Sequence, residues 1–261
     1  EFRSHIDGAK LLMTPESSME LQHTIGADIH MAFDELTAPL ASHETIAAAM
    51  NRTHAWAERS LAEVVRLRQA HPDKPYQALF GVLQGANYED LRTQTAEFLG
   101  AMDFDGYGIG GALEKETMAQ IIRWVNQILP EHKPRHLLGI SEPDDIFAAI
   151  EQGIDTFDCV SPTRVARNGA AYTPDGRVNV RGRKYREMFE PIVEGCDCYT
   201  CHHYTAAYLC HLLHARESLA GTLLSIHNER FIVKLVDDIR ASLQDGSFHL
   251  FRDDFLARYY A

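Results

Sequence analysis

The sequence lacks an apolar run that could cross a membrane, since no stretch of its 261 residues approaches the ~20 apolar residues that a spanning helix needs. Its start, Glu1 to Ser4, also lacks the basic and then apolar run of a secretory signal. We therefore expect a cytoplasmic protein. Because the first residue is not Met, we expect the natural N-terminus to be missing or processed.

Basic residues are in the minority, with 25 Lys and Arg against 37 Asp and Glu and a formal net charge of -12. This balance argues against a uniformly basic surface that coats nucleic acid. One segment differs, because residues 164–186 hold a single acid, Asp175, and seven basic residues: Arg164, Arg167, Arg177, Arg181, Arg183, Lys184 and Arg186. A solvated basic loop is one interpretation. Two tyrosines and several glycines in the segment favour the other, contacts with phosphates and bases.

Cysteine is scarce, and its count of five is odd, which argues against a disulfide framework. Three of the five, Cys196, Cys198 and Cys201, fall within six positions and predict a metal site. His227 is one candidate for the fourth ligand. The others lie closer in sequence: His202, His203, Cys210, His211 and His214. Three thiolates and an imidazole would close a tetrahedral Zn²⁺ site, which indicates a structural metal; three unliganded cysteines are the alternative.

Low-complexity segments, solenoid repeats and heptads are also absent, which excludes repeat proteins and coiled coils. Between residues 28 and 158, short β-rich runs alternate with amphipathic stretches. The predicted strands are residues 28–33, 77–83, 106–109, 135–140 and 154–157. The predicted helices are residues 44–70, 88–102, 117–129 and 144–152, and two more are expected after the cysteine cluster.

This alternation predicts an α/β fold with parallel strands, either an open doubly wound sheet or a closed (β/α)₈ barrel. Five strands are three short of a barrel, and no GxGxxG fingerprint follows the first strand to support a dinucleotide fold. Beyond residue 160 the pattern changes. We therefore divide the chain into an α/β part (1–160), a basic loop with the metal-binding subdomain (161–235) and a helical end (236–261).

Active sites of such folds form beyond the C-terminal strand ends, where this chain places Asp34, Gln84, Gly110, Gly111 and Asp158. Each aspartate could be a nucleophile, a general base or a cap. The amide of Gln84 and the bare glycine backbone would let a planar ligand approach closely, although turn glycines are common. Cys159 has no histidine nearby in sequence, and we interpret it as a buried core thiol.

Taken together, these motifs resemble one family. Their order resembles that found in bacterial tRNA-guanine transglycosylases. The matching segments are Phe33-Asp34-Glu35, the glycine segments 81–85 and 108–111, the 157–169 segment, Cys-x-Cys-x-x-Cys and His227-Asn228. The resemblance extends from residue 2 to the C-terminus. It implies a (β/α)₈ barrel with a zinc-bearing insertion, here incomplete with about five C-terminal strands, and a homodimer.

The resemblance also implies an activity, the exchange of guanine in a tRNA anticodon loop for a 7-deazaguanine base. Asp158 matches the nucleophile, and Asp34, Gln84, Gly110, Gly111 and the Ala112-Leu113 peptide match the base pocket. Leu138 matches an apolar residue against the base plane, and Arg164 and Arg167 match nucleotide contacts. The implied Zn²⁺ ligands are Cys196, Cys198, Cys201 and His227.

Two departures from the family limit this comparison. Its Asp-Ser-Gly-Gly segment, which precedes the matched region together with three barrel strands, does not occur here, and we expect these 261 residues alone to lack exchange activity. Ala112 to Glu116 replace a Leu-Ala-Val-Gly-Glu rim, and Ser141-Glu142-Pro143 replace a glycine-rich turn. The choice between the aminomethyl base and queuine therefore stays open.

Three other interpretations compete with this one. The first is a non-catalytic RNA-binding partner subunit, which the presence of Asp158 disfavours. The second is a sugar or nucleoside hydrolase with Asp34 and Asp158 as its acid and base, which leaves the basic segment unexplained. The third is a catalytic zinc, which four protein ligands disfavour.

Overall fold

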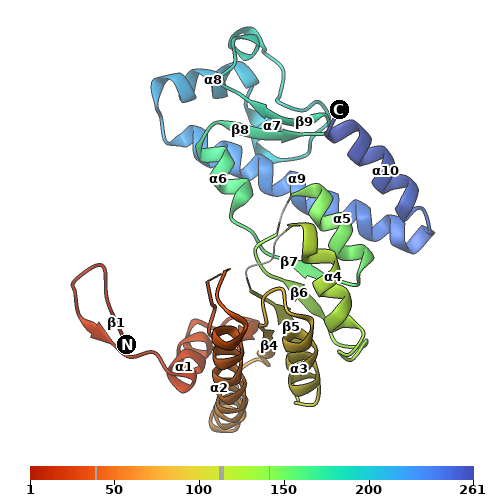
Figure 1. Ribbon diagram of the computed structural model, residues 1–261. Helices are drawn as coiled ribbons and strands as arrows, with labels where there is room; N and C mark the ends of the chain where they lie inside the picture. Colours follow the sequence, from red (N-terminus) through yellow and green to blue (C-terminus); the bar gives the residue numbers. More distant parts are fainter. Residues whose placement is uncertain (39, 112–114, 141) are drawn as a thin grey trace. The chain divides into compact units, whose positions relative to one another are not determined.

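The computed structural model describes residues 1–38, 40–111, 115–140 and 142–261 (Figure 1). The chain forms two compact units, which we describe separately. Unit 1 comprises Glu1–Leu138 and Ala148–Phe157, and unit 2 comprises Gly139–Phe147 and Asp158–Ala261. The division at residues 160 and 235 stays a prediction. No helix among the described residues is both long and apolar enough to span a membrane.

Unit 1 is built on a five-stranded parallel sheet. Its strands follow one another in chain order: β3 (Ile29–Met31), β4 (Ala78–Leu83), β5 (Gly106–Ile109), β6 (Arg135–Leu137) and β7 (Thr156–Phe157). The prediction of a parallel α/β fold with about five strands is confirmed. Because the order never reverses, the sheet has the connectivity of a barrel wall and lacks the switch point of a doubly wound sheet.

Helices connect the strands as predicted, with bounds that differ by at most three residues. They are α2 (His43–Ala70), α3 (Glu89–Gly100), α4 (Lys115–Asn126) and α5 (Pro143–Glu151), the last of which begins in unit 2. The N-terminal end adds a hairpin, β1 (Phe2–Arg3) and β2 (Lys10–Leu11), and a helix that was not predicted, α1 (Pro15–Ile25). Thr14 and Ser17 form a capping box that starts α1, with proline at its first position.

The two faces of the sheet differ in side-chain size. Tyr107 and Ile109 of β5 are fully buried, whereas Gly106 and Gly108 lie on the opposite face of the same strand. A Cβ atom at Gly106 would lie 2.5 Å from Cζ of Phe80, so only glycine fits there. On the glycine face, the Phe80 ring therefore packs directly against the backbone of β5.

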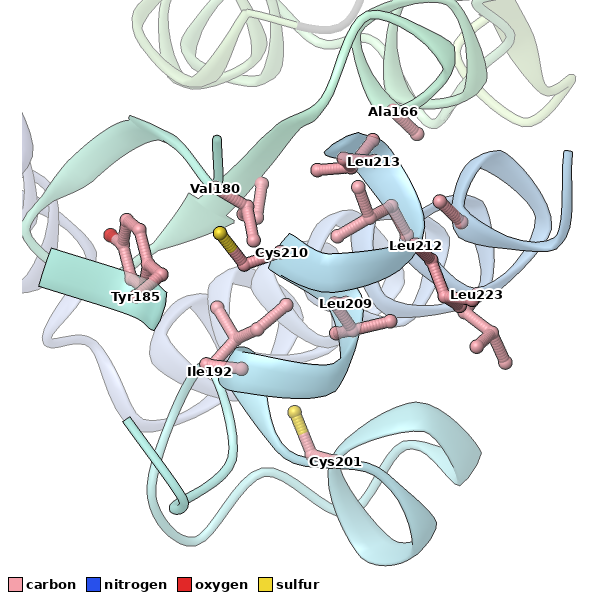
Figure 2. Packing of buried hydrophobic residues seen from close by; sticks show 14 of the residues in the cluster. Ala166, Val180, Tyr185, Ile192, Cys201, Leu209, Cys210, Leu212, Leu213 and Leu223 are labelled. Carbon is pink, nitrogen blue, oxygen red and sulfur yellow. The ribbon is translucent and has the colours of Figure 1, made fainter. Parts of the chain in front are cut away.

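Unit 2 centres on the long helix α9 (Leu219–Asp245). Around it lie α6 (Ser161–Arg167), the antiparallel hairpin of β8 (Ala170–Thr173) and β9 (Gly176–Asn179), the 3₁₀ turn η1 (Arg183–Glu187), α7 (Tyr199–His203), α8 (Ala206–Ala215) and α10 (Phe248–Tyr259). Its apolar core joins α6, α8 and α9 through residues such as Ala166, Leu209, Leu213 and Leu223 (Figure 2).

The expectation of two helices after the cysteine cluster is wrong. Three long helices, α8, α9 and α10, follow residue 201, because two left-handed residues interrupt the helical pattern. Arg216 ends α8 at φ +61°, and Gly246 ends α9 at φ +79°. Glycine at such a position is a recognisable stop signal, but arginine is not.

Candidate base pocket and metal centre

Asp34 and Gln84 meet at the carboxyl ends of two neighbouring strands. Asp34 follows β3 and Gln84 directly follows β4, so both side chains leave the same edge of the sheet. Gln84 Nε2 donates a hydrogen bond to Asp34 Oδ2 over 2.6 Å. Burial raises the pKa of the Asp34 carboxyl, and the bond from Gln84 only partly offsets this. The pair thus places a carboxylate and an amide side by side in a partly desolvated position.

Gly110 and Leu138 lie next to this pair. A Cβ atom built on Gly110 would lie 3.3 Å from both Gln84 Nε2 and Leu138 Cδ1, so both side chains lie close to the Gly110 backbone. Gly111 follows with φ +97°, a conformation that favours glycine. The structure therefore brings together all the predicted base-pocket residues that it describes, while Ala112-Leu113 lies outside the described residues.

This arrangement suits a planar ligand with neighbouring N–H donors. A carboxylate can accept two such hydrogen bonds from an amidine-type edge, as in guanine, and the bonds are strong because one partner is charged. Leu138 supplies an apolar surface, and the absent side chains at Gly110 and Gly111 let backbone groups reach the ring. Sequence reasoning missed one residue beneath this pocket, the buried Arg92 of α3.

Asp158, in unit 2, directly follows β7. Its side chain is exposed, and Oδ1 accepts a hydrogen bond from the backbone N–H of Gly139 over 3.2 Å. The expectation that the next residue, Cys159, is a buried core thiol is wrong, because this residue is only half-buried. Its Sγ accepts a bond from the Ser161 N–H at the start of α6, where the chain turns away from the strand.

Arg164 and Arg167 lie on the exposed side of α6. The other side of this short helix, with Pro162 and Ala166, is buried against α9. Other members of the basic segment have structural contacts: Arg177 lies 3.7 Å from the Glu142 carboxylate, and Arg181 donates to the Leu213 carbonyl. The exposed charge of the segment therefore includes the two arginines that were predicted to meet RNA.

Cys196, Cys198, Cys201 and His227 form a compact donor cluster, whose ligand atoms all lie within 4.8 Å of one another. The three Sγ atoms lie 3.8, 3.5 and 3.4 Å from His227 Nδ1. This set could hold a metal ion, and its composition fits Zn²⁺. Among the described residues, the rival fourth ligands are not part of the cluster; Cys210, for example, packs in the apolar core (Figure 2).

A second contact fixes the orientation of the imidazole. His227 Nε2 lies 2.8 Å from the backbone carbonyl oxygen of Tyr172, which can only accept, so Nε2 carries the proton. Nδ1 then presents its lone pair to the three sulfur atoms. Metal-ligating histidines usually have such a partner on the other nitrogen. Hydrogen bonding with Cys201 lowers the pKa of Cys198 to about 3, which favours a thiolate, whereas the pKa of Cys201 is raised.

The fold and these two sites define a class of protein: an enzyme on a parallel (β/α) barrel wall, with a carboxylate–amide pair at the carboxyl edge of the sheet and a subdomain that could hold a metal ion. The chain belongs to the family described as queuine tRNA-ribosyltransferase, whose model matches residues 1–261. The predicted resemblance is thereby confirmed.

Individual relatives carry the same name. The queuine tRNA-ribosyltransferase of Natranaerobius thermophilus is 45% identical over 262 residues, which cover 99% of this chain and 69% of that protein. That of Pelotomaculum thermopropionicum is 46% identical, with 99% and 68% covered. That of Bacillus subtilis is 41% identical, with 99% and 67% covered.

Proposed function

We propose that this chain, as part of the complete polypeptide, exchanges guanine in a tRNA anticodon, at the wobble position, for a 7-deazaguanine base. The observation that carries the proposal is the hydrogen bond between Gln84 and Asp34 at two adjacent strand ends, which lies beside a glycine edge. This arrangement offers a guanine-like ring a carboxylate acceptor and an amide from one edge of the sheet. Family membership supports the same activity.

Each residue of the pocket has a separate role in this proposal. Asp34 accepts hydrogen bonds from the ring N–H and amino groups of the base, and Gln84 supplies a polar amide beside it. Gly110 and Gly111 form the backbone rim, and Leu138 packs on the flat face. Guanine and its 7-deaza analogue share the donor edge, so one pocket can hold both the leaving and the entering base.

In the proposed reaction Asp158 is the nucleophile. A carboxylate oxygen forms a bond to the ribose C1′ atom while the bond from C1′ to N9 of guanine breaks, and guanine takes up a proton from water as it departs. The RNA is then held covalently. The deazaguanine nitrogen attacks C1′, loses its proton and displaces the carboxylate, so two displacements deliver the new base to the original face.

Zn²⁺ would be held by the four clustered ligands, Cys196, Cys198, Cys201 and His227. With four protein ligands the ion has no open position for water, so it supplies cohesion rather than chemistry. The ligands come from the 196–201 loop and from α9, and a bound ion would tie these segments together. This connection would stabilise the subdomain that carries the RNA-contacting helix α6.

Arg164 and Arg167 would contact the phosphates and bases next to the exchanged guanine. Their exposed position on α6, three residues after Asp158, supports this role. We also propose that the enzyme acts in the cytoplasm, where tRNA is processed, and as a homodimer. These two proposals rest on the family resemblance.

The alternatives account for fewer of the observations. A non-catalytic partner subunit would have no need for Asp158. A nucleoside or sugar hydrolase would need no basic helix beside its nucleophile.

A guanine-exchange assay tests the proposed function. The complete polypeptide is incubated with radiolabelled guanine and a tRNA that has guanine at the wobble position, and the same tRNA with adenine there is the matched control. We expect label in the first RNA only. Absence of label from both, or release of base without incorporation of a new one, would contradict the proposal.

A further inference from the structure

Arg92 of α3 is a buried cation without a counterion. Its side chain is fully buried, with 0% exposure, and no carboxylate of a described residue forms an ion pair with it. Burial lowers its pKa to about 9, so the guanidinium stays protonated at neutral pH. An uncompensated buried charge is costly, and an apolar side chain of similar volume would avoid this cost.

The side-chain hydrogen bonds of Arg92 go to the last residue of β4 and to the turn that follows it. Its Nε donates to the carbonyl oxygen of Ala86 over 2.8 Å, and its Nη1 donates to that of Leu83 over 3.3 Å. Gln84, the amide of the base pocket, lies between these two carbonyls. The turn is strained, because Gly85 has φ +132° and Ala86 has φ +46°, a conformation that alanine seldom adopts.

Arg92 also reaches the second turn of the pocket. The carbonyl of Leu83 accepts a hydrogen bond from the Gly110 N–H over 3.0 Å as well as the bond from Arg92. Nη2 of Arg92 is buried and has no partner among the described residues, and it lies 2.6 Å from where a Cβ of Gly111 would be. One guanidinium therefore contacts both backbone segments that form the pocket.

We propose that Arg92 is a positioning residue that fixes the turn around Gln84 and the Gly110-Gly111 turn relative to each other. The inference rests on the proposed function. With both turns fixed, the amide and the glycine edge meet one base at the same time. Both the φ of +97° at Gly111 and the close approach of Nη2 favour glycine at this position. Burying the charge costs stability, and in return the base-binding groups are already held in the geometry that binds the base.

Arg135 provides a matched control in the same sheet. It is also a buried arginine, its Nη2 donates to a backbone carbonyl, that of Leu129, and its Nη1 lies 3.3 Å from where a Cβ of Gly153 would be. It is the first residue of β6, however, at the strand end opposite the pocket. Arg92→Met and Arg135→Met therefore make similar changes to the core at opposite ends of the sheet.

The experiment measures guanine exchange by the complete polypeptide, with KM determined separately for the base and for tRNA. For Arg92→Met we expect the base KM to rise about tenfold or more and the tRNA KM to stay within about twofold. For Arg135→Met we expect both KM values to stay near those of the parent protein, with a similar loss of thermal stability. A merely structural role would reduce the active fraction and leave the base KM unchanged.

Hydrogen exchange gives a readout that needs no activity. The Gly110 amide should exchange faster in Arg92→Met than in Arg135→Met. Its acceptor, the Leu83 carbonyl, loses the hydrogen bond from Arg92 that helps to hold it in place. If Arg92→Met does not fold, Arg92→Lys decides, since it keeps the charge but loses the forked geometry: a raised base KM supports the inference and a parent-like one contradicts it. If the parent protein itself exchanges no guanine, the proposed function is wrong. If the parent protein is active and the Arg92 variants have the same base KM, only the positioning role of Arg92 is wrong.

Discussion

The imidazole of His227 joins the metal ligands to the backbone of Tyr172, since Nε2 donates to that carbonyl over 2.8 Å while Nδ1 faces three sulfur atoms. The metal site is thus coupled to the β8–β9 hairpin and not only to its own loop. Loss of the metal should therefore destabilise the whole of unit 2.

Cys198→Ser should lose zinc and stability together. The hydroxyl is a poor substitute for a thiolate, and structural zinc contributes up to about 10–16 kcal/mol of apparent binding free energy in small zinc domains. We expect less than one zinc per chain by elemental analysis and a melting temperature lower by about 10 °C or more. Cys210→Ser is the control, because Cys210 is buried in the core outside the cluster. A Cys198→Ser protein with unchanged melting would contradict a structural role.

Asn228, next to His227 in α9, connects this helix to α6 and β8. It accepts a hydrogen bond from the Tyr172 N–H and donates to the carbonyls of Pro162 and Ala170, all within 3.1 Å. Asn228→Ala leaves buried polar groups unpaired, so we expect the free energy of unfolding to fall by about 3 kcal/mol. The exposed Asn179, whose Oδ1 accepts from Arg181, is the comparison, and Asn179→Ala should cost less than about 0.5 kcal/mol. Urea titrations measure both values.

Base binding should depend on pH through Asp34. Burial raises the pKa of this carboxyl, and only the ionised form accepts two hydrogen bonds from the base. Base affinity is therefore complete above the raised pKa and falls as the pH is lowered through it, beginning at a higher pH than for an exposed aspartate. For Asp34→Asn we expect the affinity to fall by about tenfold to a hundredfold and its pH dependence to disappear.

The stability of the same variant should change in the opposite direction. Because the folded pKa lies above the unfolded one, the ionised carboxyl disfavours the folded state, and its protonation at low pH stabilises it. Asp34→Asn should therefore melt no lower than the parent protein at neutral pH. Glu35→Gln is the control, since Glu35 pairs with Arg52, and its base KM should match the parent value. Parent-like base affinity in Asp34→Asn would exclude Asp34 from base recognition.

Much of unit 1 could be predicted because each strand and helix has a local signature. The strand ends brought Asp34 and Gln84 together as expected, since parallel neighbours end at one edge. Arg92 could not be predicted, because a charged residue on an amphipathic helix normally indicates exposure, and its burial depends on how the turns at Gly85 and Gly111 pack on α3. Spacing also left the fourth metal ligand open, because only the folding of α9 beside the 196–201 loop distinguishes His227 from nearer histidines.

The covalent step can be tested by trapping. With the complete polypeptide, tRNA and a deazaguanine, we expect a protein–RNA adduct on a denaturing gel. Asp158→Asn should abolish the adduct, although its side chain can still accept the Gly139 N–H bond. Asp155→Asn is the matched control, because Asp155 precedes β7 at its other end and accepts the Arg135 N–H. An adduct that persists in Asp158→Asn would assign the nucleophile to another residue.

The arginines of α6 should control how RNA binding depends on salt. Arg164 and Arg167 are exposed on one side of the helix, and each phosphate that they neutralise releases about 0.7 of a counterion from single-stranded RNA. Each change to alanine should weaken tRNA binding and reduce the slope of log affinity against log salt by somewhat less than 1. Arg240→Ala, in α9, removes an exposed arginine that pairs with Asp237 and should leave the slope unchanged. Equal slopes for Arg164→Ala, Arg167→Ala and Arg240→Ala would place the RNA elsewhere on the protein.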